Sequence, residues 1–356
     1  MKILVITQKY DINDSNLGAF IDWWDRLACQ LEKVYILALE KQSEPTLSNM
    51  EVVSMGKERG GGFLGKIYGF YSGFFKVIGK TDAILVHMIP KYVILAAPVA
   101  FIYRKPIYMW YTGVSVHWKL RLAVLFCKKV FTAHEAAMRI ETPKRVITGH
   151  GIDVSKFVPA AHLPQGDKIP QKITILSVGR ITPSKQHDFV IRAVADLIKL
   201  GYNLKLKIIG GIIQEYHQGY FEILKKLAKD LKVDEKIEFS GPVSYDKMPE
   251  CFQNADILIN AVPFGGLDKV VLEAMASGVI PLTSNSAFKN VFPAESADNF
   301  IFKPINAEDL KIKLKNIIDN HLYQNEALLQ KLREIVVKNH NLDNLTVKIV
   351  EEIQND

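Results

Sequence analysis

Short apolar runs alternate with longer segments of helical periodicity along most of the 356 residues. In the first half these runs predict strands at 2–7, 34–39, 83–87, 107–111, 129–132 and 145–147, and the first helix is expected at 17–31. Alternation of this kind is typical of parallel α/β sheets, because each strand is followed by a helix that crosses back over the sheet. The first half is therefore predicted to be one doubly wound α/β domain.

A polar segment at 161–171 contains Pro164, Gly166 and Pro170 and has no apolar period, which indicates a linker. Beyond it the alternation restarts. Strands are predicted at 173–178, 204–209, 237–240, 257–261 and 280–283, and helices at 187–200, 220–230, 247–254 and 267–277. The second half therefore repeats the α/β organisation of the first.

The predicted domain organisation is an N-terminal Rossmann-like domain at 1–160, the linker at 161–171 and a C-terminal Rossmann-like domain at 172–339. The tail at 340–356 has apolar residues at helical spacing, which predicts a last amphipathic helix that packs back on the N-terminal domain. We expect the two domains to face each other across a central cleft. Doubly wound sheets bind ligands beyond the carboxyl ends of their strands, so the loops at those ends are the candidate sites.

The loop after the strand at 173–178 carries the first candidate chemistry. Gly179 is followed by Arg180 and then by Lys185, just before a predicted helix. A guanidinium can bind phosphate with two parallel hydrogen bonds, an ammonium adds a compact second charge, and a helix N-terminus favours anions. This arrangement suits a diphosphate, although two basic residues on an exposed loop are also compatible with a purely solvated surface.

A second constellation follows the strand at 257–261. Gly265 and Gly266 allow the backbone to approach a ligand closely, and a predicted helix begins after them. Glu273 lies inside an otherwise apolar stretch of that helix. A carboxylate in such a place either caps a buried partner or accepts hydrogen bonds from ligand hydroxyls, such as a ribose diol. Gly211, in the glycine pair that ends another strand, marks a third close-approach loop.

These motifs, taken in order, resemble the retaining glycosyltransferases of family 4, which have the GT-B fold. The resemblance rests on Gly179-Arg180 with Lys185, on the segment FSGPV at 239–243 and on LEAMASGVIP at 272–281. In the first half it is thinner and rests on Gly18, on 110–112 and on 149–153. The resemblance implies the GT-B arrangement of two Rossmann-like domains and a nucleoside-diphosphate sugar as co-substrate, with no cofactor and no metal ion.

The resemblance also implies roles for individual residues. Arg180 and Lys185 would hold the donor diphosphate and stabilise the charge that develops on the leaving group. Glu273 would bind the ribose hydroxyls. The remaining donor-binding positions would be Gly18, Gly179, Gly211, Val243, Gly265, Gly266, Leu267 and Asp268.

The sequence departs from the family pattern at two positions. Gly265 stands where relatives carry the first of two glutamates, so the donor contacts are altered. Gly113 stands where many relatives carry a histidine. The nearest histidine, His117, is therefore a third catalytic candidate that would position the acceptor or contact the sugar. An ordinary histidine at a helix start is the alternative interpretation.

Charge divides the chain unevenly. Residues 57–131 contain twelve basic and two acidic residues, whereas the formal charge of the whole chain is +7. Within this region the segment at 63–80 has a very wide apolar face and three lysines. It is either a helix buried in the first domain or an interfacial helix that contacts an anionic membrane surface. Nucleic acid is not expected as a partner, because no binding motif accompanies the charge.

Several function classes are excluded or lose support. No apolar run reaches the roughly 20 residues of a membrane-spanning helix, three scattered cysteines provide neither a disulfide framework nor a zinc site, and no nucleophile-elbow or Walker motif occurs. We therefore expect a cytoplasmic protein, peripheral at the inner face of the cell membrane.

The function that the sequence favours is transfer of a hexose or an N-acetylhexosamine, with retention, from a nucleoside-diphosphate sugar. The expected acceptor is a hydroxyl of a membrane-associated molecule, either lipid-linked or a glycan. A sugar-nucleotide epimerase of the same fold and a nucleotide-sugar-binding protein that has lost catalysis are the alternatives.

Overall fold

The computed structural model describes residues 1–14, 17–60, 62–160, 172–212 and 217–356. They form two compact units, one of Met1–Asp153 with His340–Asp356 and one of Val154–Asn339. The predicted linker at 161–171 lies outside the described residues. Within the described residues no helix is both long enough and apolar enough to span a bilayer.

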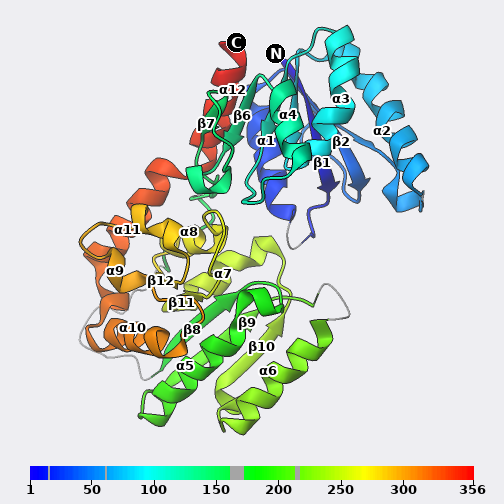
Figure 1. The fold of residues 1–356 in the computed structure, drawn as a ribbon. Helices are drawn as coiled ribbons and strands as arrows, with labels where there is room; N and C mark the ends of the chain where they lie inside the picture. The colour runs from blue at the N-terminus through cyan, green and yellow to red at the C-terminus, as the bar shows by residue number, and fades with distance from the viewer. Residues whose placement is uncertain (15–16, 61, 161–171, 213–216) are drawn as a thin grey trace. The chain divides into compact units, whose positions relative to one another are not determined.

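The first unit contains a parallel sheet of seven strands in the order β3-β2-β1-β4-β5-β6-β7 (Figure 1). Its strands are β1 (Lys2–Tyr10), β2 (Lys33–Lys41), β3 (Met50–Ser54), β4 (Ala83–His87), β5 (Ile107–Trp110), β6 (Lys129–Thr132) and β7 (Arg145–Ile147). The central strands read as near-continuous apolar runs because both of their faces are covered by helices. The prediction of a doubly wound sheet is confirmed, with the addition of the edge strand β3.

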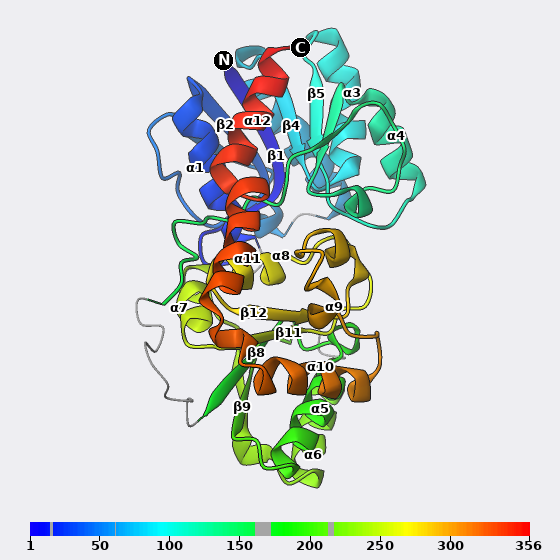
Figure 2. The same ribbon diagram turned by 90° about the vertical axis from the view of Figure 1, so that its left-hand side faces the viewer.

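Helices cover the two faces of this sheet with separate cores. One core contains α1 (Ile21–Gln30) and α12 (Leu342–Gln354), and the other contains α2 (Phe63–Val77), α3 (Pro90–Ile102) and α4 (Trp118–Phe126). The chain's last helix, α12, lies beside α1 (Figure 2). Gln30 donates from Nε2 to Thr346 Oγ1 at 2.9 Å, and Arg26 pairs with Asp343 at 2.6 Å. The C-terminal helix is thus an integral part of the first unit.

The segment at 63–80 forms helix α2 and a short 3-10 turn, and it is buried along only part of its surface. Phe70 and Phe74 are buried against the sheet, whereas Phe63, Leu64 and Tyr68 are exposed. Gly69 lies so close to β3 that a Cβ atom there would be 1.9 Å from the carbonyl oxygen of Met55. A glycine at this position therefore allows the close packing, although glycine weakens an isolated helix. The structure shows that the helix is buried on one side, and contact of its exposed side with a membrane stays a prediction.

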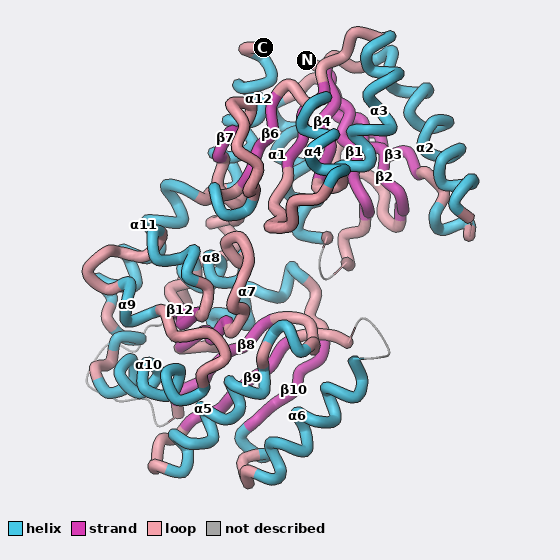
Figure 3. The backbone as a smooth tube through the Cα atoms, viewed as in Figure 1, coloured by secondary structure: helices cyan, strands magenta, loops and turns pink. Residues whose placement is uncertain are grey.

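The second unit contains a parallel sheet of five strands in the order β10-β9-β8-β11-β12 (Figure 3). The strands are β8 (Ile173–Val178), β9 (Leu204–Ile209), β10 (Ile237–Gly241), β11 (Ile257–Asn260) and β12 (Ile280–Thr283). The helices are α5 (His187–Lys199), α6 (Gln218–Asp230), α7 (Met248–Gln253), α8 (Lys269–Ala276), α9 (Ala297–Phe300), α10 (Ala307–Asp319) and α11 (Glu326–Asn339). Each predicted strand is present within one residue of its expected bounds.

Candidate functional site

The carboxyl ends of β8 and β9 meet at a pair of glycines. A Cβ atom at Gly210 would lie 1.8 Å from the carbonyl oxygen of Gly179, so only glycine is tolerated at this crossing. Backbone hydrogen bonds extend the pairing beyond the strands, from Gly179 N to Ile209 O at 2.9 Å and from Ile181 N to Gly211 O at 3.0 Å. The 179–186 loop is therefore held firmly at the edge of the sheet.

A buried histidine fixes the same loop from below. His187 Nδ1 lies 3.2 Å from Ser177 Oγ, and Nε2 lies 3.4 Å from the carbonyl oxygen of Arg180. Burial lowers the pKa of His187 to about 4, so the ring is neutral at physiological pH. Because a carbonyl oxygen only accepts hydrogen bonds, the neutral ring carries its proton on Nε2, which donates a hydrogen bond to the backbone carbonyl of Arg180. The sequence analysis did not identify His187, because nothing in the sequence distinguishes it from an ordinary residue at the start of a helix.

Two cations stand on the 179–186 loop. Arg180 is exposed, and its guanidinium has no hydrogen bond or ion pair within the described residues. Lys185 retains only 21% of its side-chain exposure and its Nζ lies 3.9 Å from Asp268 Oδ1. Burial and, more weakly, Arg180 lower the pKa of Lys185, while Asp268 opposes them. An anion bound between the two cations would relieve both effects on Lys185.

The 261–268 loop is tied to β12 through one amide. Asn285, just beyond β12, donates from Nδ2 to the carbonyl oxygen of Gly266 at 2.8 Å and to Asp268 Oδ2 at 3.3 Å. Burial raises the pKa of Asp268, and Lys185 and Asn285 oppose the rise. A Cβ atom at Gly265 would be 3.9 Å from Asn285 Nδ2 and meet nothing closer, so there is room for a side chain. The structure thus brings together Arg180, Lys185, Gly179, Gly211, Gly265, Gly266 and Asp268, and it adds Asn285.

Glu273 lies on α8 and is buried, with 5% of its surface exposed. Its Oε1 accepts a hydrogen bond from Tyr245 Oη at 3.1 Å, and Lys269 Nζ donates to the same Oη at 3.2 Å. Burial raises the pKa of Glu273, and Lys269 and Tyr245 oppose the rise. The structure therefore supplies a partly buried partner, Tyr245, for this carboxylate, which is close to one of the two interpretations of the sequence. A role toward ribose hydroxyls stays a prediction.

Gly18, Gly113 and His117 belong to the first unit. Gly18 precedes α1, and a Cβ atom there would be 2.9 Å from the carbonyl oxygen of Ile12. A Cβ atom at Gly113 would be 2.4 Å from Tyr111 Oη, so a side chain at this departure from the family pattern would require the tyrosine ring to move. His117 is the N-cap of α4, since its Nδ1 accepts from Leu120 N at 3.1 Å. Its catalytic role stays a prediction.

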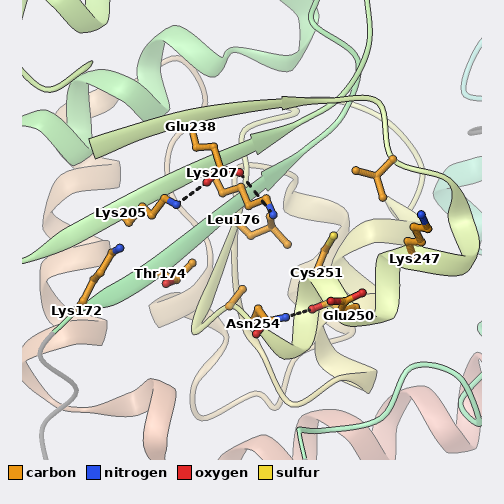
Figure 4. Close-up of a pocket in the computed structure, with 12 residues that line it drawn as sticks. Lys172, Thr174, Leu176, Lys205, Lys207, Glu238, Lys247, Glu250, Cys251 and Asn254 are labelled. Carbon is orange, nitrogen blue, oxygen red and sulfur yellow. Dashed lines mark hydrogen bonds and ion pairs between the residues drawn. The ribbon is translucent and has the colours of Figure 1, made fainter. Parts of the chain in front are cut away.

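A second basic region of this unit lies around the strands β8, β9 and β10 (Figure 4). It is a pocket of about 400 Å³ whose lining includes Val243 together with Lys172, Lys205, Lys207 and Lys247. Glu238 accepts from Lys205 at 2.5 Å and lies 3.7 Å from Lys207. The hydrogen bonds from Lys205 and Ser240, with a smaller contribution from Lys207, lower the pKa of Glu238 to about 2. One carboxylate thus contacts two of the lysines and offsets one of their two positive charges. Val243 faces this pocket, which contains no other predicted donor residue.

Comparisons with known proteins point to one family. The family model described as "Glycosyl transferases group 1" matches residues 161–339, half of the chain. A Dictyostelium discoideum protein, "GDP-Man:Man(3)GlcNAc(2)-PP-Dol alpha-1,2-mannosyltransferase", is 30% identical over 124 residues, 33% of this chain and 25% of that protein. The chain thus matches a quarter of that relative's length. "Protein CapJ" of Staphylococcus aureus is 22% identical over 292 residues, 76% of this chain and 71% of its own.

Solved structures give the fold. The crystal structure of Anabaena HepE in complex with UDP and glucose has a TM-score of 0.79 and 16% sequence identity, and the comparison covers 100% of both chains. Together with the two parallel sheets, this likeness shows the GT-B fold that the sequence predicted.

Proposed function

Because the chain belongs to the glycosyl transferases group 1, we propose that it moves a hexose or an N-acetylhexosamine from a nucleoside-diphosphate sugar to a hydroxyl. The observation that carries this proposal is the pair of cations at the carboxyl end of β8, where Lys185 faces the loop that ends at Asp268. An exposed guanidinium on an anchored backbone and a half-buried ammonium beside it suit a diphosphate. In the proposed complex the donor diphosphate lies between Arg180 and Lys185.

The proposed reaction places developing negative charge next to these cations. The bond between the anomeric carbon and the diphosphate oxygen breaks, and Arg180 and Lys185 stabilise the departing oxygens. The acceptor oxygen bonds to the same face of that carbon, and its proton passes to the leaving phosphate. This front-face route gives retention without a protein carboxylate as nucleophile. His187 supports it indirectly by holding the carbonyl of Arg180 in place.

The donor's base and sugar are separate questions for experiment. The name of the Dictyostelium relative gives GDP-Man, and the Anabaena structure contains UDP and glucose. A thermal-shift screen with GDP-mannose, UDP-glucose, UDP-N-acetylglucosamine and their free nucleotides is therefore the first test. A donor at 100 times its dissociation constant should stabilise the fold by about 2.7 kcal/mol. Failure of every nucleotide to shift the transition of the second unit would reject the proposed donor site.

The acceptor decides between this function and its rivals. A transferase yields glycoside only when an acceptor is supplied, whereas an epimerase converts the donor alone. Gly265, where the family resemblance leads us to expect a glutamate, favours one rival, a binding protein without catalysis. Donor binding without slow donor hydrolysis or transfer, across lipid-linked and glycan acceptors, would support that rival. For the transferase we propose a membrane-associated acceptor and a peripheral position at the inner membrane face.

A further inference from the structure

The outer surface of the α2–α4 layer, formed by α2, α3 and α4, exposes large apolar side chains. Those from the three helices are Phe63, Leu64, Tyr68, Phe75, Phe101, Ile102, Trp118, Leu125 and Phe126. The other core of the same unit, built with α1 and α12, instead buries its tryptophans. Clustered apolar exposure of this kind marks a surface that contacts a membrane, a ligand or another protein.

The same layer carries cations that no carboxylate neutralises. Eight basic side chains on these helices, or in the turns that follow α2 and α3, form no ion pair within the described residues: Lys66, Lys76, Lys80, Lys91, Arg104, Lys105, Lys119 and Arg121. Elsewhere in this unit lysines are paired, for example Lys9 with Asp11 at 2.8 Å and Lys129 with Glu352 at 2.8 Å. The layer therefore attracts an anionic partner that also has apolar surface.

One cavity of about 360 Å³ opens within this layer, and its lining combines both properties. Met55, Phe70 and Tyr92 are its buried apolar lining. The pocket is built from rigid parts, since Phe70 stacks on Tyr92 at 5.7 Å between ring centroids and Tyr71 Oη donates to the carbonyl oxygen of Leu95 at 3.1 Å. The cavity is therefore preformed to receive an apolar group.

Three of the unpaired lysines, Lys66, Lys91 and Lys119, also line this cavity. They come from α2, α3 and α4, so three separate elements bring ammonium groups to one opening. A lysine stem lies along apolar surface while its charged head remains in water, which suits a ligand with a chain and an anionic head. The first turns of these helices follow the carboxyl ends of β3, β4 and β5, the edge at which such sheets bind ligands.

We propose that this cavity holds the apolar chain of a phosphorylated lipid, with the lipid phosphate at Lys66, Lys91 and Lys119. The inference rests on the proposed function and deepens it, because it makes a lipid phosphate the carrier of the acceptor. Charge complementarity selects this occupant: the apolar lining alone would accept any hydrocarbon, and the three ammonium groups require an anion beside it.

Trp118 provides a direct measurement, because it lines the cavity and is 67% exposed. The chain's three other tryptophans, Trp23, Trp24 and Trp110, are at most 2% exposed. Acrylamide quenching in the full-length protein therefore reports on Trp118. Farnesyl phosphate should protect it, farnesol should bind at least about tenfold more weakly, and inorganic phosphate should give no protection. Equal protection by farnesol would remove the phosphate from the proposal.

Two triple variants with the same change of charge separate the cavity from the surface around it. Lys66→Glu with Lys91→Glu and Lys119→Glu alters the cavity, and Lys76→Glu with Lys80→Glu and Arg104→Glu alters the layer outside it. We expect the first to weaken farnesyl phosphate binding by at least about tenfold and the second by less than about threefold. Equal losses would mean a diffuse charged surface and would overturn the assignment.

Two further measurements distinguish a lipid from a protein partner and the lipid proposal from the donor proposal. An acidic amphipathic peptide that competes as well as farnesyl phosphate would replace the lipid by a protein partner. The nucleotide-induced thermal shift of the second unit serves as the control in every variant. If that shift persists while farnesyl phosphate leaves Trp118 unprotected, the lipid assignment fails and the donor proposal stands. If the shift is absent while Trp118 is protected, the donor proposal fails instead.

Discussion

The two regions proposed to meet anions, the 179–186 loop and the α2–α4 layer, hold their positive charge in opposite ways. On the loop, Lys185 is partly buried and lies 3.9 Å from Asp268, and His187 holds the backbone carbonyl of Arg180, whose side chain is exposed. On the layer eight cations stand without ion pairs beside exposed aromatic side chains. The loop therefore presents two charges at one defined place, whereas the layer outside the cavity of Lys66, Lys91 and Lys119 presents many unpaired charges.

This difference follows from what each ligand requires. A leaving diphosphate needs charge at one point and in one orientation, so preorganised donors act strongly and individually. A lipid surface presents many mobile anions, so charges add in small, similar steps and are screened by salt. Single substitutions should therefore be severe on the loop and mild on the layer outside the cavity.

Arg180→Ala should give the largest effect. Loss of one preorganised donor to a developing oxyanion costs about 10²–10³ in turnover, and Arg180 has no second partner within the described residues to lose. The measurement is kcat with a donor identified in the thermal-shift screen. Arg192→Ala on α5 is the matched control, because that arginine is also exposed and should leave kcat unchanged. Near-normal turnover of Arg180→Ala would remove the loop from the mechanism.

The second effect is on stability and depends on pH. The pKa of His187 is about 4 in the fold against 6.5 for an unperturbed histidine, so the unfolded chain binds more protons between these values. The contribution of the neutral His187 ring to the free energy of unfolding is fully present above pH 6.5 and is lost as pH falls toward 4. The total change is about 3 kcal/mol. Urea unfolding of the second unit at several pH values measures it.

His340 provides a control for this experiment in the other unit. It lies in the first unit, and burial lowers its pKa to about 4 as well. His187→Gln should flatten the pH dependence of the second unit alone, and His340→Gln that of the first. If His187→Gln leaves the acid sensitivity of the second unit unchanged, the neutral ring is not what supports the 179–186 loop.

The sequence predicted most of the fold because strands of a parallel sheet are buried on both faces and read as apolar runs. Among the elements that the sequence analysis did not place, two show why it failed. The edge strand β3 is short, and of its five residues only Met50 is buried. The helix α3 is apolar around most of its circumference and contains Pro98, so it shows no helical period. In both elements the sequence lacks the regular pattern of buried and exposed positions from which a strand or a helix is predicted.

The site was predictable only as far as strand ends could be placed. Arg180, Lys185 and Gly266 follow β8 and β11, and the topology of a parallel sheet brings these ends to one edge. His187, Tyr245 and Asn285 were missed, because their roles depend on contacts with residues of other loops. A histidine, a tyrosine and an asparagine at such positions carry no periodic signal. Contacts of this kind require the structure.

Glu273→Gln tests whether a single side chain on the neighbouring helix α8 also contributes strongly to donor binding. The amide can still accept from Tyr245 but loses the charge, so a hydrogen bond to a ribose hydroxyl would weaken by about 1–2 kcal/mol. We expect donor nucleotide affinity by calorimetry to fall about 5- to 30-fold. Tyr245→Phe is the companion variant, because it removes the internal bond and keeps the carboxylate. Unchanged affinity in Glu273→Gln would leave this carboxylate with a purely internal role.

The smallest single effect should come from the α2–α4 layer. Lys76 is exposed on α2 and unpaired within the described residues, and one lysine near an anionic membrane contributes about 1 kcal/mol. Lys76→Ala should therefore reduce binding to vesicles of phosphatidylcholine and phosphatidylserine about fivefold, measured by sedimentation at low salt. Arg180→Ala should bind these vesicles like the unaltered chain. Raising ionic strength from 0.1 to 1 M shortens the screening length from about 10 to 3 Å and should abolish most of the difference. A loss of binding that does not depend on salt would mean that Lys76 acts through one specific contact. The proposed contrast between the 179–186 loop and the α2–α4 layer would then be wrong.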